Sequence, residues 1–226
     1  MKIDVSAYLV AGRENTNGRP LEQIVAAAVK AGFTAVQIRS KEESALDLIE
    51  DCRKAAEAIR NLGKSDSVCL LVDDRLDVVL AAREMEIKVD GIHVGQTDIP
   101  VSVCRKYLGK DCVVGLSAPA KNLIQYAENY DVSEIDYFGA GPVHETSTKP
   151  DCGRDESGQV VTRTFDEIRA LAKASPVPVV VGGGVKLADI APLKEAGASG
   201  FFVVSAVAGA KKPYEAAKSL VDAWRN

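Results

Sequence analysis

The sequence contains few of the residues on which several common kinds of site depend. It has only two histidines, and its five cysteines are scattered with no CxxC pair, which argues against a zinc or iron–sulfur centre. Such cysteines indicate reduced thiols in a cytoplasmic protein. No apolar run reaches the length of a membrane span, and the short, polar N-terminal segment does not have the form of a signal peptide. We therefore expect a protein that neither crosses nor binds a membrane.

The chain also lacks an excess of positive charge. Its formal net charge is −4, so no general basic field favours nucleic acid, and any cationic side chain must act locally. The hydrophobic content of 46% is sufficient for one well-buried core. No linker or shift in composition divides the chain, so we expect a single domain over residues 1–226, with a homo-oligomer left open.

Short β-branched runs alternate with longer amphipathic segments along the whole chain. We expect strands at residues 5–10, 35–38, 68–72, 91–94, 112–116, 135–138, 177–181 and 200–204. The expected helices cover residues 20–30, 40–62, 76–85, 100–108, 119–129, 165–174, 187–196 and 213–224. The second helix is expected to open with a capping box formed by Ser40 and Glu43.

This strict alternation predicts parallel strands joined by crossover helices. The repeat of eight units predicts an α/β fold of the (β/α)8 TIM-barrel class near the small end of its size range. A doubly wound sheet is the competing architecture. However, the turn after the first strand reads A-G-R-E-N-T-N-G and lacks the G-x-G-x-x-G pattern of that fold.

In barrels of this class, the reacting groups lie at the carboxyl ends of the strands and in the loops that follow. These positions hold a consistent set of polar, charged and glycine residues. In chain order they are Gln37, Arg39, Lys41, Asp73, Asp74, Asp98, Ser117, Thr146, Thr148, Lys149, Gly184, Val204 and Ser205.

Three kinds of subsite follow from the residue types. Asp74 and Asp98 end neighbouring strands, and such hard oxygen ligands favour Mg²⁺, although a lone aspartate is more often a helix cap or a solvated loop group. Arg39, Lys41 and Lys149 supply cations for a diphosphate. The glycines at 182–184 and the turn at 204–207 lie where this fold usually binds a phosphate.

The aromatic residues and histidines have simpler expected roles. His93 alternates with apolar neighbours, so we expect it to be hydrogen-bonded inside the barrel. His144 lies beside the threonines and could shape a pocket. We expect Trp224 and the tyrosines to pack helices.

Taken together, these motifs resemble the thiamine-phosphate synthase (thiamine-phosphate pyrophosphorylase) family over nearly the whole chain. The resemblance is carried by Q-I-R-S-K from residue 37, V-D-D-R from 72, G-I-H-V-G-Q-T-D from 91, G-L-S from 115, Y-F-G-A-G-P-V from 137, T-S-T-K from 146, G-G-G-V from 182 and V-S-A-V from 204. It implies a transferase that joins 4-amino-2-methyl-5-(diphosphooxymethyl)pyrimidine to 4-methyl-5-(2-phosphooxyethyl)thiazole, or its carboxylated form, and releases diphosphate with the help of Mg²⁺.

The resemblance also implies a role for each site residue. Gln37, Arg39, Lys41, Asp73, Ser117 and Lys149 would hold the pyrimidine diphosphate, with Arg39, Lys41 and Lys149 catalytic. Asp74 and Asp98 would hold Mg²⁺. Thr146, Thr148, Gly184, Val204 and Ser205 would hold the thiazole phosphate.

Two features depart from the family pattern. The family usually has asparagine where this chain has Asp73, which adds negative charge near the expected diphosphate. The loop at 151–160 is unusually charged, and its glycines could hinge a lid, with a solvated loop as the alternative.

Two other functions remain open on the same barrel. One is a thiazole tautomerase or a non-catalytic regulatory paralogue, which would lack the full diphosphate and metal set. The other is a sugar-phosphate epimerase or isomerase, which would need a base pair of carboxylates or histidines.

Overall fold

Eight parallel strands close into a barrel in the computed structural model, which describes residues 3–146 and 159–226. The strands are β1 (Ala7–Ala11), β2 (Ala35–Ile38), β3 (Cys69–Asp73), β4 (Gly91–Val94), β5 (Val113–Ser117), β6 (Tyr137–Ala140), β7 (Val179–Val181) and β8 (Gly200–Val203). Each strand pairs with the next one in the chain, and β8 returns to β1 with Phe202 opposite Tyr8. The (β/α)8 prediction is confirmed.

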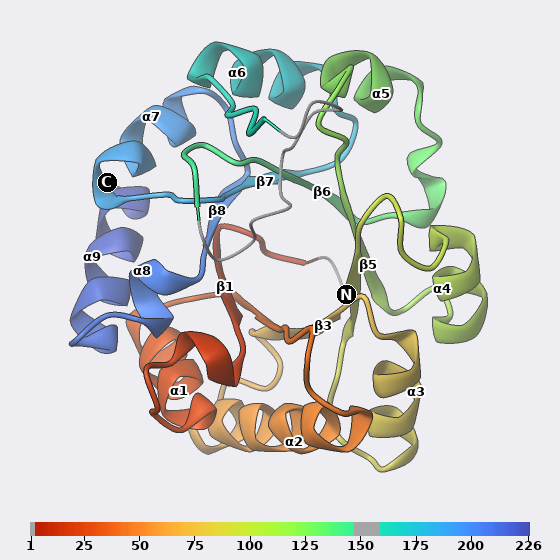
Figure 1. Ribbon diagram of the computed structural model, residues 1–226, viewed down its shortest axis with the longest axis vertical. Helices are drawn as coiled ribbons and strands as arrows, with labels where there is room; N and C mark the ends of the chain where they lie inside the picture. Colours follow the sequence, from red (N-terminus) through yellow and green to blue (C-terminus); the bar gives the residue numbers. More distant parts are fainter. Residues whose placement is uncertain (1–2, 147–158) are drawn as a thin grey trace.

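Helices form a ring around the strands (Figure 1). They are α1 (Leu21–Ala31), α2 (Ala45–Asn61), α3 (Leu76–Glu84), α4 (Val101–Leu108), α5 (Leu123–Asn129), α6 (Phe165–Ala174), α7 (Ile190–Glu195), α8 (Ser205–Ala208) and α9 (Pro213–Arg225). The described residues also form three short 3-10 helices, η1 (Arg13–Asn15), η2 (Val132–Glu134) and η3 (Leu187–Asp189). None of the described helices combines the length and the apolar character needed to cross a membrane.

Side-chain alternation along the strands produces two separate apolar cores. Outward residues such as Leu9 and Val36 pack against the helices in the larger core. Inward residues such as Leu71 fill the barrel, and Ile3 and Val5 from the segment before β1 join them. The N-terminal segment therefore closes the amino end of the barrel, while the carboxyl end is left for a site.

Several element boundaries differ from the sequence-based expectation, and two of them have a clear physical reason. Strand β6 lies two residues later than expected and includes Gly139, which has low strand propensity. A Cβ at Gly139 would lie 3.0 Å from Cε1 of His93, so the glycine leaves room for that ring. Helix α5 begins at Leu123 rather than 119, because Asn122 adopts a left-handed backbone with φ 52°.

The start of α2 also corrects a prediction. The helix is capped by Ser44, whose Oγ accepts the amide of Asp47 at 3.2 Å, and not by Ser40. The Oγ of Ser40 instead accepts the amides of Glu42 and Glu43, both at 3.4 Å, within the preceding loop. The Glu43 side chain turns toward Arg13, so it does not complete a capping box with Ser40.

This cap assignment can be tested by stability measurements. Ser44→Ala should lower the free energy of unfolding by about 1 kcal/mol, because an amide of the first helical turn loses its acceptor. Ser40→Ala is the matched control and should cost less than half as much. Urea denaturation of the two variants checks this, and a larger loss for Ser40→Ala would contradict the assignment.

Candidate functional site

A cavity of about 670 Å³ opens at the carboxyl ends of the strands. It is lined by every predicted site residue that the structure describes. These residues come from β2, β3 and β5 and from the segments that follow β2, β3, β4, β6, β7 and β8. These are Gln37, Arg39, Lys41, Asp73, Asp74, Asp98, Ser117, Thr146, Gly184, Val204 and Ser205. The predicted residues Thr148 and Lys149, and most of the predicted lid, lie outside the described residues.

A buried ion pair occupies one side of this cavity. Nε of Arg39 lies 3.0 Å from Oδ2 of Asp73, and Nε2 of Gln37 donates to Oδ1 of the same carboxylate at 3.0 Å. Arg39 and Asp73 are 9% and 8% exposed, so little solvent screens the pair. Asp73 thus orients the two side chains that extend from the end of β2, and it does not cap α3.

Two further carboxylates line the same cavity. Asp74 has a left-handed backbone with φ 59°, and its amide donates to the carbonyl of His93 at 2.8 Å, which ties the end of β3 to β4. Aspartate is one of the few residues other than glycine that tolerate this conformation. Oδ2 of Asp98 accepts the amide of Gly95 at 2.8 Å, which fixes the loop after β4.

This donor set fits Mg²⁺ better than a transition metal. Within residues 3–146 and 159–226, no group of three or more histidine, cysteine, aspartate and glutamate side chains is arranged to hold a metal. Mg²⁺ needs fewer protein ligands, because it keeps several waters and binds through one or two carboxylates together with substrate phosphates. Asp74 and Asp98 would supply those carboxylates.

On the opposite side, the loop after β6 packs against the glycines after β7. Nε2 of His144 lies 2.9 Å from Oδ2 of Asp189, which also accepts the amide of Lys186 at 2.8 Å. Gly184 has a φ of 72°, and a Cβ at this position would lie 2.9 Å from the Cβ of His144. Only glycine therefore allows the two loops to approach this closely. This contact places Thr146 at the cavity.

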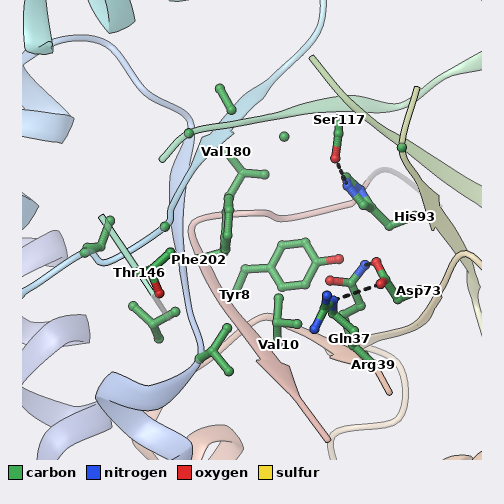
Figure 2. A pocket seen from close by; sticks show the side chains of 18 of the residues that line it. Tyr8, Val10, Gln37, Arg39, Asp73, His93, Ser117, Thr146, Val180 and Phe202 are labelled. Carbon is green, nitrogen blue, oxygen red and sulfur yellow. Dashed lines mark hydrogen bonds and ion pairs between the residues drawn. The ribbon is translucent and has the colours of Figure 1, made fainter. Parts of the chain in front are cut away.

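Apolar side chains separate the two polar sides. Figure 2 shows the Gln37, Arg39 and Asp73 group across the cavity from Thr146, with Tyr8, Val10, Val180 and Phe202 between them. The cavity can therefore hold small molecules with charged groups at its two sides and an apolar part in the middle.

The apolar side chains between the two polar sides, which form the floor of the cavity, were not predicted from the sequence, and the expectation for two tyrosines was wrong. Tyr8 and Tyr137 lie inside the barrel and line the cavity rather than packing helices. The helix-packing expectation does hold for Trp224, whose ring centroid lies 5.6 Å from that of Phe201. Alternate residues of a strand point to the same side, so the inward-facing positions of each strand would have identified the floor residues, as Tyr8 and Val10 show.

The interior role predicted for His93 is confirmed. Its Nδ1 lies 2.9 Å from the hydroxyl of Tyr137, and its Nε2 lies 2.9 Å from Oγ of Ser117. The dashed contact to Ser117 is visible in Figure 2. Both ring nitrogens thus contact neighbouring side chains.

An acidic cluster supports the loop that carries Lys41. Arg13 binds Oδ1 of the buried Asp51 through Nε at 2.9 Å and Nη2 at 2.7 Å, and Glu43 lies 3.6 Å from the same Nε. One carboxylate oxygen each of Glu43 and Asp51 is buried without a hydrogen-bond partner. Burial and the nearby charge of Asp51 raise the pKa of Glu43 from 4.5 to about 7, against the opposing effect of Arg13.

The raised pKa predicts a specific dependence of stability on pH. Folded Glu43 keeps a proton that the unfolded chain releases, so the free energy of unfolding should fall as pH rises from about 4.5 to about 7. Glu43→Gln keeps a neutral side chain and should remove this slope, which would make the variant more stable at pH 8 by roughly 1–3 kcal/mol.

Urea denaturation between pH 4.5 and 8 measures this difference. Glu42→Gln, at the exposed neighbouring position, is the matched control and should follow the parent protein. Parallel stability curves for Glu43→Gln and the parent would show that Glu43 does not hold the proton.

Comparison with known proteins identifies consistent relatives. A family model described as thiamine monophosphate synthase matches residues 7–207. A thiamine-phosphate synthase of Natronomonas pharaonis is 35% identical over 223 residues, covering 99% of this chain and 96% of the relative. One from Corynebacterium jeikeium is 37% identical over 222 residues, covering 97% and 94%. In fold, the chain is similar to a solved thiamine phosphate pyrophosphorylase of Pyrococcus furiosus, with a TM-score of 0.79 over 99% of this chain and 97% of that one, at 24% identity.

Proposed function

This chain belongs to the thiamine monophosphate synthase family of enzymes, and we propose that it joins a pyrimidine diphosphate to a thiazole phosphate with release of diphosphate. The substrates would be 4-amino-2-methyl-5-(diphosphooxymethyl)pyrimidine and 4-methyl-5-(2-phosphooxyethyl)thiazole, or the carboxylated form of the latter. The product would be thiamine phosphate.

The division of the cavity into two polar sides carries this proposal. Arg39, Lys41 and the three aspartates lie around the ends of β2 to β4, which suits a diphosphate together with a divalent cation. Thr146, Gly184 and the start of α8 lie across the cavity, where hydroxyl and amide donors suit a phosphate ester. One cavity can therefore hold two anionic substrates with their heterocycles facing each other.

On the diphosphate side, this chain's residues stabilise the leaving group. Asp73 binds Arg39 through its Nε, so the Nη groups of the guanidinium would bind phosphate oxygens. Lys41 adds a second cation. Mg²⁺, held by Asp74 and Asp98, would neutralise charge that develops on the departing diphosphate.

The chemistry requires little proton transfer by the protein. The carbon that bears the diphosphate is of the benzylic type, and the electron-rich aminopyrimidine stabilises the cation that forms when the C–O bond breaks. The thiazole nitrogen then donates its lone pair to that carbon. Placing the two rings in line over the apolar floor is the remaining task of the cavity.

The geometry disfavours the two alternative functions. An epimerase or isomerase would need a pair of carboxylate or histidine bases. Both histidines contact protein side chains, His93 with Tyr137 and Ser117, and His144 with Asp189. The Asp73 carboxylate is bound by Arg39 and Gln37. A tautomerase or regulatory paralogue would not need the grouping of Arg39, Lys41, Asp74 and Asp98 around one cavity.

The decisive experiment combines the purified protein with both heterocycles and measures diphosphate release and thiamine phosphate formation. We expect both products to require the two substrates and Mg²⁺, and to appear in equal amounts. Asp74→Asn and Asp98→Asn should each raise the Mg²⁺ concentration needed for half-maximal rate. Failure to form thiamine phosphate with Mg²⁺ present would refute the proposal.

Lys41 offers a test of leaving-group stabilisation that does not disturb a buried pair. Arg39→Ala would remove the ion-pair partner of the buried Asp73 carboxylate, so a loss of activity could not be separated from a loss of stability. Lys41, in contrast, is exposed. Lys41→Ala should lower kcat/KM roughly a hundredfold, as loss of one preorganised charge contact does, with little change in Tm.

Lys64→Ala is the matched control, because Lys64 is an exposed lysine between α2 and β3, at the other end of the barrel. It should leave kcat/KM unchanged. Equal losses for the two lysine variants would show that Lys41 acts through general charge rather than through contact with the diphosphate.

A further inference from the structure

Four side chains form one hydrogen-bonded chain across the inside of the barrel. The hydroxyl of Tyr8 on β1 lies 2.9 Å from that of Tyr137 on β6, which lies 2.9 Å from Nδ1 of His93 on β4. Nε2 of His93 lies 2.9 Å from Oγ of Ser117 on β5. The chain runs from the buried interior to the cavity wall, since Tyr8 and Tyr137 are at most 2% exposed and Ser117 is only partly buried.

The surrounding packing fixes this chain in place. The ring of Tyr137 passes over Gly115, where a Cβ would lie 2.2 Å from its Cζ, and the ring of His93 lies against Gly139. The rings of His93 and Tyr137 are stacked, with centroids 5.5 Å apart and planes 24° apart. The two glycines thus let both rings pack closely against the neighbouring strands, in the positions that the chain requires.

The buried end of the chain decides which way its protons point. Burial raises the pKa of the Tyr8 and Tyr137 hydroxyls well above 10, so both keep their protons. Within the described residues, the one hydrogen-bond partner of the Tyr8 hydroxyl is Tyr137. If Tyr137 donated to Tyr8, the proton of Tyr8 would be buried without an acceptor, which is costly.

The arrangement in which every buried hydroxyl donates a hydrogen bond therefore has its donors directed from Tyr8 toward the cavity. Tyr8 donates to Tyr137, and Tyr137 donates to Nδ1 of His93. A neutral imidazole that accepts at Nδ1 carries its proton on Nε2, so His93 donates to Oγ of Ser117. Oγ of Ser117 then accepts a hydrogen bond from Nε2 of His93, and its own hydroxyl proton points toward the cavity.

We propose that Tyr137 and His93 are positioning residues that lock the hydroxyl of Ser117 as a hydrogen-bond donor directed at the pyrimidine diphosphate. This inference rests on the proposed function for the identity of the anion. With the opposite tautomer, Nε2 of His93 would accept the serine proton, and an anionic oxygen in the cavity would meet only lone pairs.

The tautomer is tested directly by ¹⁵N NMR of the imidazole nitrogens, without any substrate. The chain has two histidines, and loss of one set of signals in His93→Gln identifies those of His93. We expect a protonated Nε2 and an unprotonated Nδ1. Tyr137→Phe should disturb this state, whereas Tyr8→Phe, which also removes one buried hydroxyl, should preserve it because Tyr137 still donates. A protonated Nδ1 in the parent protein would overturn the proposal.

A double-mutant cycle tests the consequence for binding. Tyr137→Phe and Ser117→Ala should each raise KM for the pyrimidine substrate about 5- to 20-fold, the effect of one hydrogen bond to a charged group, and leave KM for the thiazole substrate unchanged. In the Ser117→Ala background, Tyr137→Phe should have no further effect on this KM.

The outcomes separate this inference from the proposed function. A purely structural role for Tyr137 would make the two substitutions additive, or would raise both KM values together, and either result overturns the inference while thiamine phosphate is still formed. If the parent protein forms no thiamine phosphate, the proposed function fails, and the NMR experiment still decides the tautomer.

Discussion

The packing inside this barrel depends on the steric fit of large side chains against glycines that lie on, or directly after, neighbouring strands. Tyr137 lies over Gly115, and Phe202 lies over Gly182, where an added Cβ would approach the ring to 2.3 Å. A closed barrel of this size has room inside for only a few layers of side chains, so each ring requires a missing side chain beside it. The rings fill the middle of the barrel, and the cavity begins directly above them.

The charge balance of the cavity is a second constraint, and it follows from that shape. Asp73 and Arg39 lie near the bottom of the opening, where low exposure strengthens their attraction. The pair holds the guanidinium in place before a substrate arrives, which favours preorganisation. For the proposed diphosphate substrate, the pair would also reduce the net positive charge at the site, so the proposed divalent cation and Lys41 would contribute more than they would beside a neutral asparagine.

Most of the fold could be predicted from the sequence, because strands and helices of a (β/α)8 barrel differ in period and length. The element boundaries that were predicted wrongly can be traced to specific side-chain contacts. Ser44, rather than Ser40, caps α2 because the side chain of Glu43 is drawn to Arg13, and β6 includes Gly139 because His93 needs the space. Such contacts join residues distant in sequence, and a capping pattern or a strand propensity contains no information about them.

The site was predictable to the extent that polar residues at strand ends mark it. Position alone placed Asp74, Asp98 and Thr146 at one cavity, and the structure agrees with that placement. What sequence reasoning missed are partnerships, such as the bond of Gln37 to Asp73 and the chain from Tyr8 to Ser117. These depend on the register of strands around the closed barrel, which no short motif encodes.

Ile3 and Val5 close the amino end of the barrel, and this affects how small molecules enter and leave it. Because the amino end of the barrel is filled, small molecules reach the cavity from the carboxyl ends of the strands. Both proposed substrates would therefore enter, and both products would leave, through the same opening at the carboxyl ends of the strands.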